Sequence, residues 1–298
     1  MTTPRVRYSP RVRYSSVERG EVGDAAADDE LLVPWWSFTK TVLAASALTL
    51  VRDGALALDR PVDGEAYTLR QLLQHTAGLG DYGEVADYHT AVAHRDEPWS
   101  VNELLLRSRA AELRYPPGMG WRYSNIGYLK VRRLIEHTAQ MPLEAVLDRA
   151  VFAPLRISGA KLARARADLL PVAMGEAAGY HPGWVYHGLL VGTLGEATRL
   201  LHRLLSGALL PAELMRDMRS ARPVGQAIPG RPWVAPGYGL GLMVDLAGSD
   251  GPTGHTGGGP GSTIAVFRRE RRGAPITVAA FAYGGDQGAV EHVAFGAG

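Results

Sequence analysis

The sequence predicts a mixed α/β (α+β) fold, with one antiparallel sheet built from both ends of the chain, flanked by helices, and an inserted, mainly helical lobe. Strand-like patterns lie near the N-terminus, helical patterns fill the middle, and Gly, Pro and β-formers dominate after Pro223. The economical arrangement is a single sheet on which both ends meet. We therefore expect a sheet-containing lobe from residues 1–64 and 222–298, a helical lobe from 65–221, and a site at their seam.

The elements in chain order begin with a hairpin over residues 11–23, with Arg19-Gly20 at its turn, and a helix over 37–53. Residues 41–51 are apolar on all sides, so this helix is expected to be buried, and Gly54 is a natural C-terminal stop. Further helices are expected at 69–75, 101–110, 126–138, 143–152 and 194–207, and strands at 237–246, 262–270 and 276–283.

Composition excludes several classes of protein. The net charge of +2 in 298 residues gives no basic surface of the nucleic-acid-binding kind. Cys is absent, which rules out disulfides and thiolate metal sites, and the nine His show no metal-ligand spacing. We therefore expect no nucleic-acid partner and no metal site. His181 and His187, which bracket Pro-Gly-Trp, are interpreted as loop structure.

The N-terminal residues 1–16 are basic but lack the apolar core of a secretory signal, and no apolar run reaches the ~18 residues that span a bilayer. We therefore expect a cytoplasmic protein without membrane association, or a periplasmic or secreted one if a leader was removed. The repeat Arg-Val-Arg-Tyr-Ser at 5–9 and 11–15 is interpreted as a strand, with a basic nucleic-acid arm as the alternative.

A serine and a lysine three residues apart open the buried helix. The chain has three Lys against 29 Arg, so Lys40 is an unusual choice of cation. Unlike Arg, Lys can lose its proton when desolvated and then act as a base. Residues i and i+3 share a helix face, so Ser37 and Lys40 are interpreted as a nucleophile beside its base. The alternative is an ordinary N-cap serine.

A second pair with the same spacing, Ser158 and Lys161, lies beside Gly159 and before a mixed Arg/Ala stretch. This context is typical of surface structure, so Ser158 is not expected to be a nucleophile.

Two further segments carry polar groups in Gly-rich surroundings. Tyr123 and Asn125 follow a loop with Pro117 and Gly118, and Tyr123 can accept a proton only if a nearby ammonium lowers its pKa from about 10. The segment 255–261 (HTGGGPG) leads into a predicted strand, and its glycines let a ligand approach backbone N–H groups. Taken singly, the first segment could be a half-buried Tyr with a turn-forming Asn, and the second a plain hairpin loop.

Together the three segments, which read SFTK (37–40), YSN (123–125) and HTG (255–257), resemble the serine β-lactamase and penicillin-binding-protein superfamily. The resemblance is to its class C-like branch, with DD-peptidases, esterases and D-amino-acid amidases. Softer matches are LLQHTAGL (72–79) and GYGLGL (237–242). The resemblance implies an acyl-enzyme serine hydrolase that needs no metal or organic cofactor. It assigns the nucleophile to Ser37, proton transfer to Lys40 and Tyr123, the oxyanion site to the backbone N–H groups of Ser37 and Gly258, and substrate contacts to Asn125, His255, Thr256 and Gly257.

The third segment carries His255 where β-lactamases of this superfamily mostly carry Lys, which is more similar to its peptidase and esterase members. The expected substrates are therefore esters or amides of small molecules. The alternatives are a DD-carboxypeptidase, a weak β-lactamase, or a non-hydrolytic penicillin-binding sensor. Four tryptophans are candidates to line an apolar acyl pocket, with core packing as the alternative: Trp35, Trp36, Trp121 and Trp184.

Overall fold

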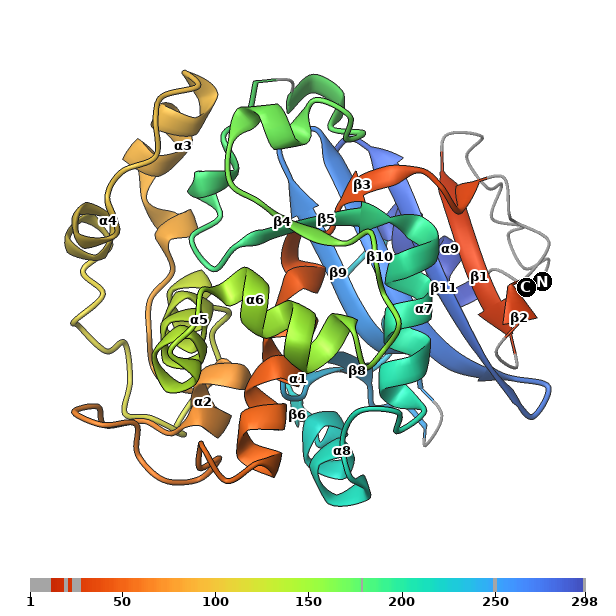
Figure 1. Ribbon diagram of the computed structural model, residues 1–298, viewed down its shortest axis with the longest axis horizontal. Coiled ribbons are helices and arrows are strands. Elements are labelled where there is room, and N and C mark those ends of the chain that lie inside the picture. Colours follow the sequence, from red (N-terminus) through yellow and green to blue (C-terminus); the bar gives the residue numbers. More distant parts are fainter. Residues whose placement is uncertain (1–11, 19–20, 23–27, 178, 249–250, 297–298) are drawn as a thin grey trace.

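A large antiparallel sheet occupies one side of the molecule and a group of helices the other, with helix α1 (Thr39–Arg52) between them (Figure 1). The computed structural model describes residues 12–18, 21–22, 28–177, 179–248 and 251–296. Within these residues, no helix is long and apolar enough to cross a membrane.

The large sheet has eight strands in the order β2-β1-β11-β10-β9-β8-β7-β6. Strand β1 pairs with β11 in a register that places Arg13 opposite Phe281, so both ends of the chain build one sheet, as predicted. The strands are β1 (Arg13–Glu18), β2 (Glu21–Val22), β6 (Arg222–Pro223), β7 (Pro236–Tyr238), β8 (Met243–Asp245), β9 (Thr253–Gly259), β10 (Ser262–Arg271) and β11 (Ala274–Tyr283).

Helices cover both faces of this sheet because its inner strands are apolar on both sides. On β10, Ile264 and Val266 join the main core, which α7 (Leu194–Leu205) covers. Ala265 and Phe267 point the other way and pack with α9 (Gln287–Gly296) in a second cluster. The alternation follows from the two-residue period of a strand.

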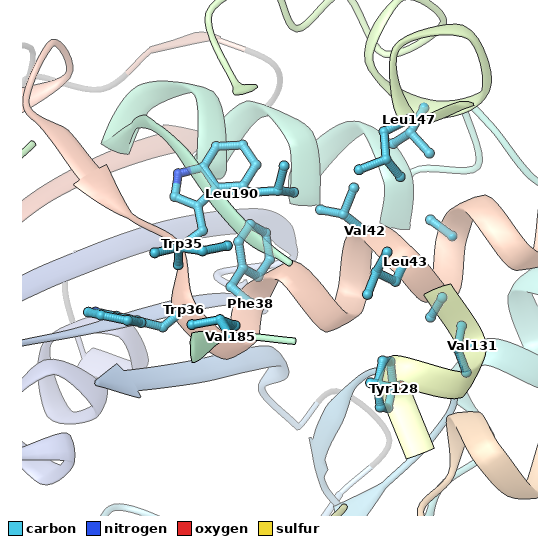
Figure 2. Packing of buried hydrophobic residues seen from close by; sticks show 14 of the residues in the cluster. Trp35, Trp36, Phe38, Val42, Leu43, Tyr128, Val131, Leu147, Val185 and Leu190 are labelled. Atoms are coloured by element: carbon cyan, nitrogen blue, oxygen red, sulfur yellow. The ribbon is translucent and has the colours of Figure 1, made fainter. Parts of the chain in front are cut away.

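Helix α1 is the centre of the main core. All of its residues from Thr39 to Leu50 are buried, and it packs against α5 (Asn125–Ala139) and α6 (Leu143–Leu147). Figure 2 shows Trp35, Phe38 and Leu43 packed against this core near the start of the helix. The remaining elements are α2 (Leu69–Leu73), α3 (Ala86–Ala93), α4 (Val101–Arg107), α8 (Ala212–Arg219) and a small sheet of β3 (Leu32–Pro34), β5 (Leu189–Thr193) and β4 (Lys161–Ala163).

The predicted fold class is confirmed, with local differences. The strand expected over 237–246 is split into β7 and β8, because Gly241 between them has a positive φ of 72° that turns the chain. Helices α3, α8 and α9, strand β6 and the small sheet were not predicted. The turn expected at Arg19-Gly20 lies outside the described residues. We keep the two-lobe division as a proposal, although α7, from the expected helical lobe, lies on the sheet.

Candidate active site

Ser37 lies in a short 3-10 turn, Trp36–Phe38, that joins β3 to α1. Trp36 has a φ of 40°, a left-handed conformation that is rare for a bulky side chain. Its indole Nε1 donates a hydrogen bond to Ser262 Oγ at 3.1 Å, and its ring packs over Gly259. Contacts with β9 and β10 thus hold the sharp turn that presents Ser37, as is common where strain is kept at functional sites.

Lys40 and Tyr123 both reach the hydroxyl of Ser37. Lys40 Nζ lies 3.1 Å from Ser37 Oγ, and the Tyr123 hydroxyl donates to the same oxygen at 2.8 Å. Lys40 is completely buried, and this desolvation lowers its pKa from 10.5 to about 7, against the opposing effect of Asp81. Near neutral pH the amine is therefore partly unprotonated and can accept a proton.

Tyr123 does not meet the condition for a proton acceptor, which was a pKa lowered from about 10. Burial of the phenol raises its pKa, and the negative charge of Asp81 acts in the same direction, while the hydrogen bond to Ser37 opposes them. Tyr123 is thus a neutral hydrogen-bond donor at working pH. Of the two expected proton acceptors, only Lys40 has its pKa near neutrality.

Asn125 is held by a carboxylate that sequence reasoning missed. Its side-chain Nδ2 donates to both oxygens of Asp81 at 3.1 Å, and its backbone N–H donates to Oδ1 at 3.2 Å. Burial raises the pKa of Asp81, while hydrogen bonds and Lys40 lower it. Asp81 lies two residues after the end of the LLQHTAGL segment (72–79), so that motif was the available signal.

His255 and Thr256 lie within β9, which stands between β8 and β10 in the sheet. Strand β8 pairs only with Thr253 and Gly254 of β9, so His255 and Thr256 pair with β10 alone. His255 Nδ1 contacts the Thr256 carbonyl oxygen at 2.7 Å, and its Nε2 lies 2.8 Å from the hydroxyl of Tyr238. Burial lowers the pKa of His255 to about 3, with help from Lys40. The imidazole is therefore neutral, and its hydrogen bond goes to Tyr238 rather than to Tyr123.

Thr256 is tied to a second missed residue, Glu291 on α9. The Thr256 hydroxyl donates to Glu291, whose carboxylate also accepts from Arg231 Nε at 2.7 Å and from Trp233 Nε1 at 3.0 Å. Glu291 has no solvent exposure, so these donors satisfy a buried charge.

Gly257 and Gly258, which were expected to contact the substrate and to form the oxyanion site, differ in their surroundings. Gly257 is buried, and a Cβ built on it would lie 2.7 Å from the backbone nitrogen of Ser37. Gly258 is exposed and lines the cavity beside Ser37, so its backbone can approach a ligand.

A cavity of about 450 Å³ opens beside these residues. Trp121 lines it, as expected, and Trp233 is a further tryptophan that the sequence did not single out. Trp35, Trp36 and Trp184 are instead buried in the main core, which was the alternative interpretation for these residues. The lining includes Ser37, Trp121, Tyr123, Asn125, Val224, Ile228, Arg231, Trp233, Tyr238, Met243, His255, Thr256, Gly258 and Gln287.

His187 was interpreted as loop structure, and its backbone does lie in the turn before β5. Its side chain, however, is buried, with Nε2 3.2 Å from Lys40 Nζ. The two residues are 147 positions apart, so no local pattern could have revealed the contact. Ser158, by contrast, is exposed, as expected. Within the described residues, no cluster of His, Asp and Glu is arranged to hold a metal ion.

The sequence model of the Beta-lactamase family matches residues 5–293, so the chain belongs to this family, and the resemblance seen in the three motifs is confirmed. The esterase EstB of Burkholderia gladioli is 34% identical over 141 residues, which cover 40% of this chain and 35% of that protein. The chain spans about a third of the length of the curated relatives it matches.

Solved structures show the same fold. The D-stereospecific amidohydrolase from Streptomyces sp. has a TM-score of 0.76 and 22% identity, covering 97% of this chain and 94% of its own. The D-amino acid amidase from Ochrobactrum anthropi SV3 has a TM-score of 0.74 and 25% identity, covering 90% and 87%. An esterase and two amide-cleaving proteins are thus among the similar proteins, in agreement with the expected class of hydrolase.

Proposed function

We propose that the protein is a serine hydrolase that cleaves esters or amides of small molecules through a covalent acyl-enzyme on Ser37. One observation carries the proposal: Ser37 Oγ lies 3.1 Å from the amine of Lys40, whose pKa burial lowers to about 7. An unprotonated amine beside a serine hydroxyl is what general-base activation of a nucleophile requires. The adjacent cavity gives a substrate access to that hydroxyl.

In the proposed reaction, Ser37 Oγ attacks the carbonyl carbon of the substrate while its hydrogen passes to Lys40 Nζ. The carbonyl oxygen takes up the electron pair, and the backbone N–H groups of Ser37 and Gly258 stabilise its charge. When the carbon–leaving-group bond breaks, the departing atom takes the proton of the Tyr123 hydroxyl, which lies 2.8 Å from Oγ. The Lys40 ammonium then returns a proton to Tyr123, which restores both groups. Water then attacks the acyl-enzyme, releases the acid and restores the Ser37 hydroxyl.

The lining of the cavity supports an apolar acyl group or side chain. Trp121, Ile228, Trp233 and Met243 surround its space with aromatic and aliphatic surface. The similar D-amino acid amidase acts, by its name, on D-amino acid amides. Amides of apolar amino acids are therefore a second substrate class for this cavity, after short-chain esters.

The charges around the cavity favour substrates without a free carboxylate. Among the described residues that line it, Arg231 is the one with a cationic side chain, and the carboxylate of Glu291 balances its charge. His255 is neutral because burial lowers its pKa to about 3. DD-peptides and β-lactams carry a carboxylate that would need a cation here, so they rank below esters and amides.

The test compares kcat/KM for p-nitrophenyl butyrate, D- and L-phenylalanine p-nitroanilide, and nitrocefin, with Ser37→Ala as the inactive control. We expect the ester or one anilide to be hydrolysed at least tenfold faster than nitrocefin. Nitrocefin turnover equal to or above both would refute the proposed substrate class. Stoichiometric acylation by penicillin without turnover of any substrate would instead favour the penicillin-binding sensor.

A further inference from the structure

His187 approaches the lysine of the site from an element that the proposed mechanism does not use. It lies in the turn between the 3-10 helix Pro182–Trp184 and β5. Its ring is 2% exposed, and Nε2 lies 3.2 Å from Lys40 Nζ. Its other nitrogen, Nδ1, is buried and has no hydrogen-bond partner within the described residues. All polar contact made by this ring is therefore directed at Lys40.

Packing alone does not explain an imidazole at this position. A buried polar atom without a partner destabilises the fold, so an apolar side chain of similar size would serve the core better than His187. Burial and the nearby charges of Lys40 and Arg132 lower the pKa of His187 well below its usual value. The ring is thus neutral and offers one donor and one acceptor. A protonated Lys40 can only donate, so facing it Nε2 must accept and Nδ1 must carry the ring hydrogen.

The donor and the acceptor can then be assigned in each hydrogen bond around Ser37 Oγ. Tyr123 donates to Ser37 Oγ, so the hydrogen of Ser37 must point to another acceptor, and Lys40 Nζ is 3.1 Å away. To receive that hydrogen, the free amine must turn its lone pair toward Ser37 and direct an N–H elsewhere. His187 Nε2 is the acceptor that the structure places there.

We propose that His187 is a positioning residue: its Nε2 accepts an N–H of Lys40 and so holds the lone pair of the amine on the Ser37 hydroxyl. The inference rests on the proposed function, because it concerns the base of that reaction. Without this acceptor, the amine can rotate about its terminal bond and is aligned with Ser37 for only part of the time. Misalignment of a reacting group is costly even when every group is present.

Two substitutions distinguish the effect of a hydrogen-bond acceptor at the position of Nε2 from the effect of the size of the side chain. In His187→Gln, the amide oxygen can occupy the place of Nε2 and still accept from Lys40. In His187→Asn, the shorter side chain places its amide near Nδ1, out of reach of Lys40. Both variants are polar and neutral, so Asn is the matched control for Gln, and His187→Leu removes both nitrogens.

The first readout is the rate at which a fluorophosphonate labels Ser37. In this step the Oγ–P bond forms, fluoride leaves, and the proton of Ser37 passes to Lys40, so no substrate turnover is needed. We expect Gln to keep the rate within about fivefold, and Asn and Leu to lose about 10–100-fold. With a substrate, the loss is expected in kcat and not in KM, because His187 does not line the cavity.

The second readout is the pH at which labelling falls to half. An acceptor for the ammonium stabilises the charged form, so its loss is expected to move this midpoint to lower pH in Asn and Leu and to leave it near 7 in Gln. The variants leave unchanged the other titratable and charged groups around Lys40 and His187, which are His75, Asp81, Tyr123, Tyr128, Arg132 and His255.

Equal labelling rates in Gln and Asn, or a Leu variant within threefold of wild type, would overturn the inference. Thermal melts accompany each variant, and if Leu does not fold, the Gln and Asn pair decides. A wild type that is labelled but hydrolyses nothing would refute the proposed hydrolase while leaving the His187 test intact.

Discussion

The amine of Lys40, in the first turn of α1, lies 3.1 Å from the hydroxyl of Ser37, in the 3-10 turn just before that helix. Helix α1 is buried without a break from Thr39 to Leu50. Burial is what makes this contact chemically useful. A solvated lysine would remain an ammonium at neutral pH, whereas the buried amine has its pKa lowered to about 7.

The pH dependence of the reaction follows from this pKa. The unprotonated amine is the active form, so kcat/KM is expected to rise with pH through about 7 and to level off above pH 8. Lys40→Arg keeps the charge but cannot lose its proton, and activity is expected to fall on the order of 10²–10⁴-fold. Steady-state kinetics from pH 5 to 9 test both. A flat profile, or a folded Lys40→Arg enzyme within threefold of wild type, would show that a permanent cation suffices.

The same burial is expected to cost stability. The unfolded chain protonates Lys40 up to about pH 10.5 and the folded protein only below about 7, so between these values the unfolded state binds more protons. The free energy of unfolding should therefore rise with pH across this window, and the penalty is fully present below pH 7. At about 1.4 kcal/mol per pKa unit, its upper limit is roughly 5 kcal/mol.

Lys40→Met should remove this penalty. We expect a variant that is inactive but more stable at pH 7 by about 1–3 kcal/mol, since unpaired Ser37 and His187 offset part of the gain. Urea denaturation at pH 7 and pH 10 measures the difference. A variant less stable than wild type at both values would show that the lysine contributes favourable contacts that outweigh its desolvation.

Tyr123 and Lys40 contact the same oxygen and are expected to act as one unit. Tyr123→Phe removes the donor 2.8 Å from Ser37 Oγ, so kcat/KM is expected to fall by about 10²-fold or more. The double variant with Lys40→Arg should lose far less than the product of the two single losses. A double-mutant cycle on kcat/KM gives the coupling, and strictly multiplicative losses would mean that the residues act independently.

Gly257 is expected to tolerate no side chain. A Cβ there would lie 2.7 Å from the nitrogen of Ser37 and 2.8 Å from Trp36 Cβ, so Gly257→Ala must displace the turn that presents the nucleophile. We expect a loss of about 10²-fold in kcat/KM with a modest fall in the melting temperature. The control is Gly285→Ala, where a Cβ meets nothing within 4 Å. Equal activity in both variants would contradict the claim that a Cβ at residue 257 displaces the turn that holds Ser37.

The sequence predicted those parts of the site in which the residues lie only two or three positions apart in the chain. Ser37 and Lys40 are three residues apart across the 3-10 turn and the first turn of α1, and Tyr123 lies two residues before Asn125, the first residue of α5. Their mutual placement within each pair therefore follows from local geometry. The sheet built from both chain ends was predictable too, because strand patterns bracket the helical middle. The break at Gly241 was not, since a glycine inside a strand pattern does not reveal its φ.

The rest of the site depends on tertiary packing. His187 meets Lys40 across 147 residues, and Glu291 meets Thr256 across 35. The raised pKa of Tyr123 was missed for the same reason, because a sequence does not show that the phenol is buried or that Asp81 acts on it. Three of the four candidate pocket tryptophans are core residues, because the sequence alone could not distinguish pocket lining from core packing.

The most direct test of the central claim is the mass of the protein after reaction with a fluorophosphonate at pH 8. The account predicts one adduct per chain, located by peptide mapping on the peptide that contains Ser37. Ser37→Ala should carry no adduct, and Ser158→Ala should be labelled like wild type. Labelling that persists undiminished in folded Ser37→Ala would contradict the assignment of Ser37 as the nucleophile.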